Sequence, residues 1–207
     1  MNARRVAVTG MGVIAPNARS VDELFAQLAA GRSAVRRLTA PMCETLRSPI
    51  GAAVDFDGGA HFGAARLRML DRVSQLALVA AAQAIADARL DFATLNRERC
   101  GVSVGTGMGG AESSDEGYHI IYAERSDRVK PYTVLTSMTN AAASWIGIDY
   151  GICGPNLTYS TACSSSAVAL GEAARRIRSG EVDVMIAGGA EAPLCFGVLR
   201  AWEAMRT

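Results

Sequence analysis

The sequence predicts an α/β layered fold with a largely buried sheet, and two observations predict it. Short apolar segments alternate along the chain with longer segments whose apolar residues recur at helical spacing. Half of the 207 residues are hydrophobic, enough for one large domain over residues 1–207 to bury a full core. Helix crossovers between the strands leave the strand order open.

The N-terminal third contains one predicted strand and one predicted helix. Residues 6–10 are short and apolar and run into a glycine turn, which favours a buried strand. Ser20 opens a capping box and predicts a helix that ends at Gly31. Prolines and glycines break the pattern over residues 32–67, so we expect a surface excursion with one extended piece at 50–56.

The middle of the chain predicts a long helix followed by a strand. Asp71 can cap an Ala-rich helix over residues 72–89, whose small side chains allow close packing. Residues 100–105 are short and apolar and open into a glycine loop at 106–110. We therefore expect a second buried strand that ends in this loop.

The last third alternates helices and strands. Residues 140–150 predict a helix that Gly151 stops, and residues 165–179 predict another, which a glycine also stops. Between and after them, residues 157–160 and 182–187 read as strands.

Charge and composition exclude several classes of function. Lys and Arg number 21 against 20 Asp and Glu, and they are scattered, so no strong field attracts nucleic acid or a membrane surface. No apolar run approaches the ~20 residues of a membrane span, and the start lacks a signal-peptide pattern. The sequence predicts a soluble, cytoplasmic protein.

The five cysteines are odd in number and form no C-x-x-C pair, so neither a disulfide framework nor a metal site is indicated. Free cysteine usually behaves as a small buried hydrophobe. We expect this packing role for four of them: Cys43, Cys100, Cys153 and Cys195.

Cys163 differs because residues 158–166 run from a predicted strand directly into a predicted helix, with only small residues after the thiol. This pattern is typical of a nucleophile elbow. The N–H groups and dipole of the following helix favour the thiolate and can stabilise an oxyanion. Spacing alone leaves open the alternative of a buried structural cysteine at a strand end.

The stretch Thr161-Ala162-Cys163-Ser164-Ser165-Ser166 resembles the active-site stretch of the β-ketoacyl carrier-protein synthases. The resemblance covers the whole chain, through residues 8–12, 71–77, 105–110, 154–155 and 187–191. It implies a thiolase-like fold, of which this chain is the N-terminal α/β half of a layered α-β-α-β-α architecture. The C-terminal half is absent from these 207 residues.

The resemblance implies decarboxylative Claisen condensation of an acyl thioester with malonyl-acyl carrier protein, in fatty acid or type II polyketide synthesis. Cys163 takes the role of acyl acceptor by motif match. The family's two histidines and lysine come from the C-terminal half, and neither His61 nor His119 matches their motifs. We therefore expect this half to be inactive alone.

Substrates of this family travel on the phosphopantetheine of acyl carrier protein, and no bound cofactor is implied. The glycine loop lacks the pattern of a phosphate cradle, so nucleotide binding is not expected. By position in the resemblance, Ala162, Ser114 and Thr133 shape an acyl tunnel. Ser114 and Thr133 can equally be ordinary loop residues.

Arg66 and Arg68 lie where the resemblance implies docking of the acidic carrier protein, although both can equally be solvated surface arginines. Because the family forms dimers, the expected partners also include a second synthase chain, as a homodimer or a ketosynthase heterodimer. Two other functions remain open. One is a thiolase that uses coenzyme A thioesters, and the other is a non-catalytic, chain-length partner subunit.

Overall fold

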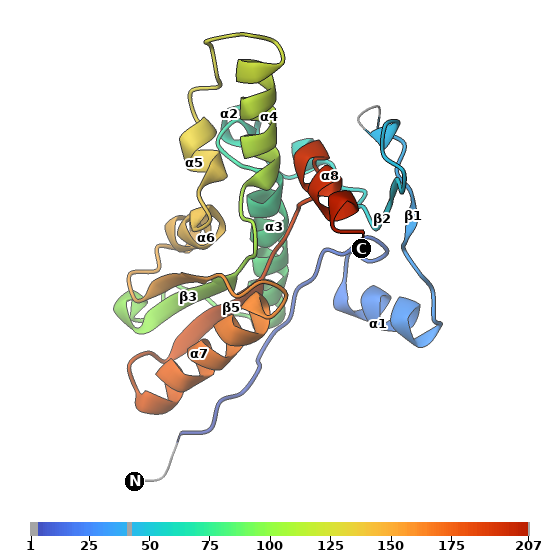
Figure 1. Cartoon of the computed structure of the whole chain (residues 1–207). Helices are drawn as coiled ribbons and strands as arrows, with labels where there is room; N and C mark the ends of the chain where they lie inside the picture. Colours follow the sequence, from blue (N-terminus) through green and yellow to red (C-terminus); the bar gives the residue numbers. More distant parts are fainter. Residues whose placement is uncertain (1–3, 41–42, 207) are drawn as a thin grey trace.

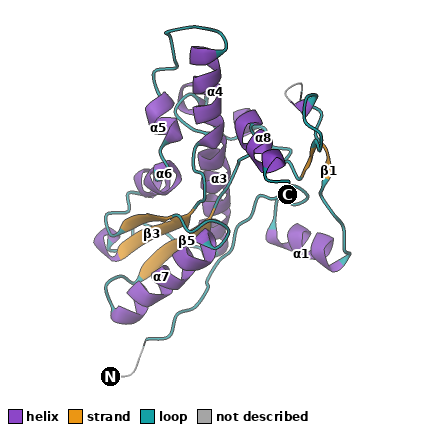
Figure 2. Ribbon diagram, in the orientation of Figure 1, coloured by secondary structure: helices purple, strands orange, loops and turns teal. Residues whose placement is uncertain are grey.

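The computed structural model describes residues 4–40 and 43–206. It contains a parallel sheet with helices on both faces, as Figures 1 and 2 show. The strands, in the spatial order β4-β3-β5, are β4 (Asn156–Tyr159), β3 (Cys100–Gly105) and β5 (Val184–Gly189). One face is covered by α7 (Ser165–Ser179) and the other by α3 (Arg72–Asp87) and α6 (Ala141–Tyr150). The layered α/β prediction is confirmed.

The register brings the carboxyl ends of the strands to one edge. Gly105 at the end of β3 pairs with Tyr159 of β4 and with Gly189 of β5. The sequence predicted these three strands to within two residues but left their order open. The central strand β3 is fully buried, whereas β4 and β5 are mostly half-buried.

Successive side chains of β3 point to opposite faces of the sheet, and the two faces pack differently. Val102 and Val104 point into the hydrophobic core beneath α3 and α6. On the opposite face, Ser103 and Gly105 lie against α7, where the hydroxyl of Ser103 donates to the carbonyl of Ala169 at 2.8 Å. The helix meets this face with small buried residues at a spacing of four: Ser165, Ala169 and Ala173.

Asp71 is a buried carboxylate that caps two helices. Its Oδ1 accepts from the N–H of Val73 in α3, as the sequence predicted, and its Oδ2 accepts from the N–H of Ser113, both at 2.9 Å. Ser113 lies in the first turn of α4 (Ala111–Tyr122). Carboxylates at helix N-termini are stabilising, so one side chain fixes both helix starts.

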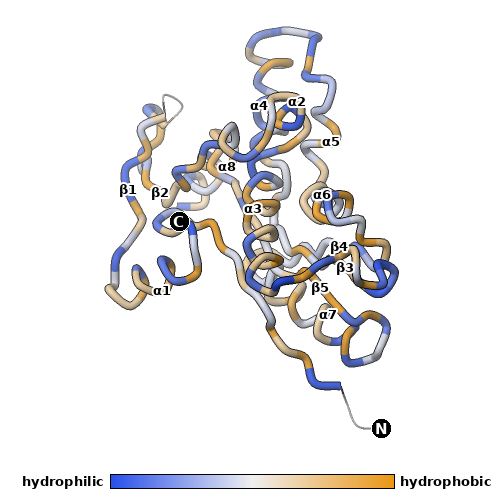
Figure 3. Tube along the Cα trace, turned by 180° about the vertical axis from the view of Figure 1, so that it is seen from behind, coloured by the Kyte–Doolittle hydropathy of each residue, from blue (hydrophilic) through white to orange (hydrophobic). Residues whose placement is uncertain are grey.

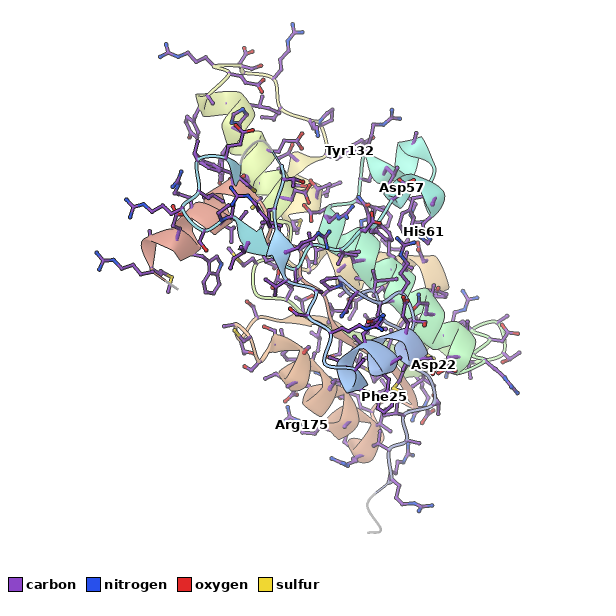
Figure 4. The ribbon with its side chains drawn as sticks, turned by 90° about the vertical axis from the view of Figure 1, so that its right-hand side faces the viewer. Asp22, Phe25, Asp57, His61, Tyr132 and Arg175 are labelled. Carbon is purple, nitrogen blue, oxygen red and sulfur yellow. The ribbon has the colours of Figure 1, made fainter. Side chains whose placement is uncertain are left out.

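The remaining helices agree in part with the sequence. In α1 (Val21–Ala29) the Ser20 hydroxyl accepts from the N–H of Glu23, as predicted, but Phe25 is 74% exposed (Figure 4). The helices α6 and α7 end at left-handed glycines, Gly151 and Gly180. The sequence did not predict α4, α5 (Thr133–Ser137) or α8 (Phe196–Ala204).

The predicted surface excursion contains short elements. Two-residue strands, β1 (Arg36–Arg37) and β2 (Ile50–Gly51), pair antiparallel. The expected extended piece at 50–56 is a strand only at its start. Three helical turns complete the described elements: η2 (Gly58–Ala60), α2 (Ala64–Leu67) and η3 (Arg97–Arg99).

The predicted strand at residues 6–10 is wrong. The segment is hydrophobic (Figure 3), but Val8 is 81% exposed, and no strand among the described residues pairs with it. Glycines hold it close to α3 instead, because a side chain on Gly10 would meet the carbonyl oxygen of Ala84 at 2.3 Å. Without a neighbouring strand to accept its backbone bonds, an apolar run remains irregular.

None of the described helices is both long enough and apolar enough to cross a membrane.

We predict that Gly105→Ala strongly destabilises the protein. A Cβ at this position would lie 2.2 Å from the carbonyl carbon of Ser165, and a strand end packed on backbone cannot give way. The expected loss is about 3 kcal/mol or more in the free energy of unfolding, measured by denaturant titration.

Gly171→Ala is the matched control for Gly105→Ala. Gly171 lies inside α7, and a Cβ added there would meet no neighbouring atom within 4 Å, so alanine should raise helix stability by about 0.5–1 kcal/mol. Equal effects of the two substitutions would contradict the packing described for Gly105.

We predict a pH-dependent contribution from Asp183, which ties the N-terminal segment to the sheet. Hydrogen bonds and charge from Arg99, and then from Arg4, lower the pKa of this carboxyl from 3.8 to about 2. A carboxyl group whose pKa is lowered in the folded state stabilises the fold at pH values above its ordinary pKa. This stabilisation is lost as the pH falls from the ordinary pKa through the lowered pKa. The thermal midpoint of wild type should therefore exceed that of Asp183→Asn at neutral pH, and the difference should shrink from pH 3.8 towards about 2. A difference that stays constant over this range would contradict the assignment.

Candidate functional site

Cys163 lies in the tight turn between β4 and α7, at the edge where the three parallel strands end. The chain leaves β4 at Tyr159 and enters α7 at Ser165. Ala162, directly before the thiol, has a left-handed backbone with φ of 52°. A non-glycine residue in this region is uncommon and marks a sharp turn. The predicted strand-to-helix elbow is confirmed.

Hydroxyl groups of the serine-rich stretch hold the turn. The buried Ser165 hydroxyl donates to the carbonyl of Ala162 at 2.6 Å and accepts from the N–H of Thr161 at 2.9 Å. The Ser164 hydroxyl donates to the carbonyl of Thr161 at 2.7 Å. The small residues after Cys163 therefore fix the backbone of the elbow, in addition to leaving space around the thiol.

Cys163 is exposed in this chain, which excludes the alternative of a buried structural cysteine. Cys43, Cys100 and Cys195 are buried, as expected, and burial raises the pKa of the last two thiols. The packing role expected for Cys153 is wrong, because this residue is exposed in the turn after α6.

The elbow places Cys163 two residues before a helix of 15 residues. The first N–H groups of a helix have no partner within it and carry the positive end of its dipole. This arrangement can hydrogen-bond an oxyanion that forms beside the thiol.

A second loop lies beside the elbow, and the sequence assigned it no role in this site. The glycine loop after β3 is held by the carboxylate of Glu191, which accepts from the N–H of Gly107 at 2.6 Å and of Met108 at 3.3 Å. The Ser160 hydroxyl donates to the carbonyl of Gly107 at 3.4 Å. The sequence does contain one signal, because the acidic residue Glu191 follows a strand end. Its hydrogen-bond partners could be identified only once the order of the strands was known.

Ser114 and Thr133 lie in helices, and neither is a loop residue. Ser114 is in α4 and donates to the carbonyl of Gly110, whereas Thr133 begins α5 and donates to the carbonyl of Lys130. The two helices pack together, with the Thr133 methyl group 3.2 Å from where a Cβ on Gly117 would lie. Both residues thus belong to one helix pair that follows the glycine loop.

The two arginines of the proposed docking surface differ in their surroundings. Arg66 is half-buried, bonds Asp149 at 2.6 Å and stacks over Trp145 with its guanidinium 5.3 Å from the ring centroid. Arg68 is exposed. Arg66 therefore has a structural partner, and Arg68 is the more accessible of the two charges.

The two histidines have contacts away from the elbow. His61, which is labelled in Figure 4, follows η2 and stacks on Phe56 with ring centroids 5.1 Å apart. His119, in the last turn of α4, lies 3.6 Å from Glu124. Among residues 4–40 and 43–206, no group of three or more His, Cys, Asp and Glu side chains could hold a metal ion.

A surface cavity of about 540 Å³ lies at the opposite end of the sheet from Cys163. Its lining includes Phe92, Arg97 and Tyr150, which lie near the start of β3. It is therefore separate from the edge that carries the thiol.

The fold and the site define a class: a layered α/β protein with an exposed cysteine on a strand-to-helix elbow. The family model "Beta-ketoacyl synthase, N-terminal domain" matches residues 3–207. The chain belongs to the β-ketoacyl synthase family and has its thiolase-like fold.

Relatives and solved structures agree with this assignment. The chain is 33% identical to 3-oxoacyl-(acyl-carrier-protein) synthase 2 of Coxiella burnetii (strain RSA 493 / Nine Mile phase I), over 100% of this chain and 51% of the relative. It resembles the ishigamide ketosynthase/chain length factor with a TM-score of 0.87 and 27% identity, covering 98% of this chain and 51% of that one. A chain of AntDE:AntF, a type II PKS acyl-carrier protein in complex with its ketosynthase, matches with a TM-score of 0.78 and 26% identity. The match covers 98% of this chain and 55% of that one.

The chain spans about half the length of the curated relatives that it matches.

Proposed function

We propose that this chain is the nucleophile-bearing half of a β-ketoacyl-acyl carrier protein synthase, in which Cys163 accepts the acyl chain. One observation carries the proposal: Cys163 is exposed at an elbow, two residues before the start of α7. The other four cysteines lack this setting.

The proposed chemistry has two steps. The Cys163 thiolate attacks the carbonyl carbon of an acyl thioester, and the carrier's thiolate leaves as the new carbon–sulfur bond forms. Loss of carbon dioxide from a malonyl thioester then supplies a carbanion that attacks the acyl-cysteine carbonyl, and the Cys163 thiolate is released. The helix N-terminus stabilises the oxyanion in both steps.

The malonyl thioester needs groups that polarise it, and the printed contacts of the chain's histidines and its lysine lie elsewhere: His61 stacks on Phe56, His119 lies beside Glu124, and Lys130 pairs with Glu116. We propose that these groups come from the part of the protein outside this chain. Acid–base and preorganised electrostatic groups are each commonly worth ~100-fold or more, so the 207-residue chain alone should not condense substrates measurably.

We propose acyl carrier protein as the substrate carrier and a second synthase chain as a partner. The relative from Coxiella burnetii is named for acyl carrier protein, and two of the similar structures are a ketosynthase with its carrier protein and a ketosynthase with a chain length factor. The small residues Ala162, Ser114 and Thr133 would then leave room for the acyl chain, and no bound cofactor is needed.

Two other functions give different results in the same assay. A thiolase would take its acyl group from coenzyme A, without a carrier protein. A non-catalytic, chain-length partner subunit would not be acylated, and the presence of an exposed thiol on the elbow favours the catalytic function.

We predict that Cys163 of the full-length protein becomes acylated. Incubation with an acyl carrier protein thioester should add the mass of the acyl group to the chymotryptic peptide that contains Cys163, which cleavage after Tyr159 separates from Cys153. Cys163→Ala should abolish the addition. Cys153→Ala is the matched control, because Cys153 is also exposed but lies outside the elbow. Absence of acylation would favour the partner subunit, and acylation by coenzyme A thioesters alone would favour the thiolase. Malonyl-dependent product from the isolated 207-residue chain would contradict its proposed inactivity.

We predict that Arg68→Glu weakens binding of the acidic carrier protein about 10-fold without lowering the thermal midpoint, because the side chain is exposed. Arg66→Glu should lower the midpoint as well, since it breaks the pair with Asp149. Arg178→Glu, an exposed position at the far end of α7, is the control for net charge. Equal affinities of wild type, Arg68→Glu and Arg178→Glu for the carrier protein would refute the docking surface.

A further inference from the structure

Glu191 lies two residues beyond the end of β5 and gathers the donors of the glycine loop. Besides the N–H groups of Gly107 and Met108, its carboxylate accepts from the Thr106 hydroxyl at 3.2 Å. The Thr106 oxygen in turn accepts from the N–H of Gly109 at 3.0 Å. The Glu191 side chain thus accepts hydrogen bonds from three donors of one short loop. Through the Thr106 hydroxyl it also holds a fourth, the N–H of Gly109.

The converging N–H groups of the loop favour an anion at this point. Successive backbone N–H groups that converge on one position form a concave positive site, and charge-assisted hydrogen bonds to it are stronger than neutral ones. The approach is close, because a Cβ on Gly107 would lie 2.9 Å from the Glu191 Oε2. A side chain at position 107 would therefore force the Glu191 carboxylate to shift.

The loop that Glu191 holds lies against the elbow. A Cβ on Gly107 would be 3.9 Å from the Cα of Ala162, and the Gly107 carbonyl accepts from the Ser160 hydroxyl. The N–H of Thr106 also donates to the carbonyl of Tyr159 at the end of β4, at 3.0 Å, and the N–H of Ala190, after β5, donates to the carbonyl of Gly105, at the end of β3, at 3.1 Å. These contacts join the glycine loop to the turn.

Ala162 makes this support necessary. Its left-handed backbone is costly for a residue with a Cβ, and such conformations persist only where the surroundings determine them. The hydroxyls of Ser164 and Ser165 hold the turn from the helix side. The glycine loop adds a further contact, from Gly107 to Ala162.

We propose that Glu191 is a positioning residue of the synthase: it fixes the glycine loop against Ala162 and so sets the orientation of the Cys163 thiol. Glu191 does not touch the reacting atoms, and its effect passes through Gly107. This inference rests on the proposed function for the acyl-transfer step, and on the geometry alone for the reactivity of the thiol.

The test compares three variants of the full-length protein. Glu191→Ala removes the acceptor, Glu191→Gln keeps one acceptor oxygen without the charge, and Glu181→Gln is the control. Glu181 precedes β5 at the opposite end of the sheet, where it pairs with Arg176. Two rates are measured on each: acyl transfer to Cys163 at saturating acyl carrier protein thioester, and alkylation of Cys163 by iodoacetamide, which needs no acyl donor.

We expect Glu191→Ala to lower the rate constant of acyl transfer by ~10- to 100-fold, since displacements of ~1 Å at a reacting group can cost ~100-fold. The concentration of thioester that gives half-maximal rate should be unchanged. Glu191→Gln should recover part of the rate, and Glu181→Gln should match wild type although it also loses a carboxylate pair. A merely structural role would instead lower thermal midpoints while leaving the rates of folded protein unchanged.

Wild-type rates in both Glu191 variants would overturn the inference, as would an equal loss in Glu181→Gln. If Glu191→Ala does not fold, Glu191→Gln carries the comparison. If wild type itself is not acylated, the proposed function fails, and the iodoacetamide rates still decide the role of Glu191: a slower alkylation in Glu191→Gln than in Glu181→Gln supports it, and equal rates refute it.

Discussion

The close contact between α7 and the buried strand β3 is the constraint on which the site depends. Gly105 allows the first turn of α7 to lie directly on the strand end, and Ser103 ties the next turn through the carbonyl of Ala169. Larger residues at these positions would move the helix away from the sheet. Cys163 is only two residues before α7, so the contact between α7 and β3 also sets its position. The packing of the helix on the sheet therefore determines where the reactive thiol lies.

Much of this arrangement could be predicted from the sequence, because its signals are local. Short apolar segments predicted the three strands, and Asp71 predicted the start of α3. The glycines at 151 and 180 predicted the ends of two helices. The order of small residues around Cys163 gave the elbow. These features depend on backbone preferences within a few residues, which a single sequence contains.

The rest depended on long-range partners. Residues 6–10 have the composition of a strand but no described neighbour to pair with, and α4 is fixed by Asp71 from 42 residues away. The contacts of Glu191 with Gly107 join positions 84 residues apart, which meet only because β3 and β5 are adjacent and parallel. Strand order could not be derived from the sequence, so neither could this part of the site.

The central claim is that the elbow, and not exposure alone, makes Cys163 reactive. The most direct measurement is competitive alkylation of the full-length protein with substoichiometric iodoacetamide. Chymotrypsin, which cuts after Tyr159, then separates Cys153 from Cys163, and the modified fraction of each peptide is quantified. Both thiols are exposed, and of these two Cys163 is the one that precedes a helix N-terminus. The account predicts at least ~10-fold faster modification of Cys163. Equal rates at the two cysteines would contradict it.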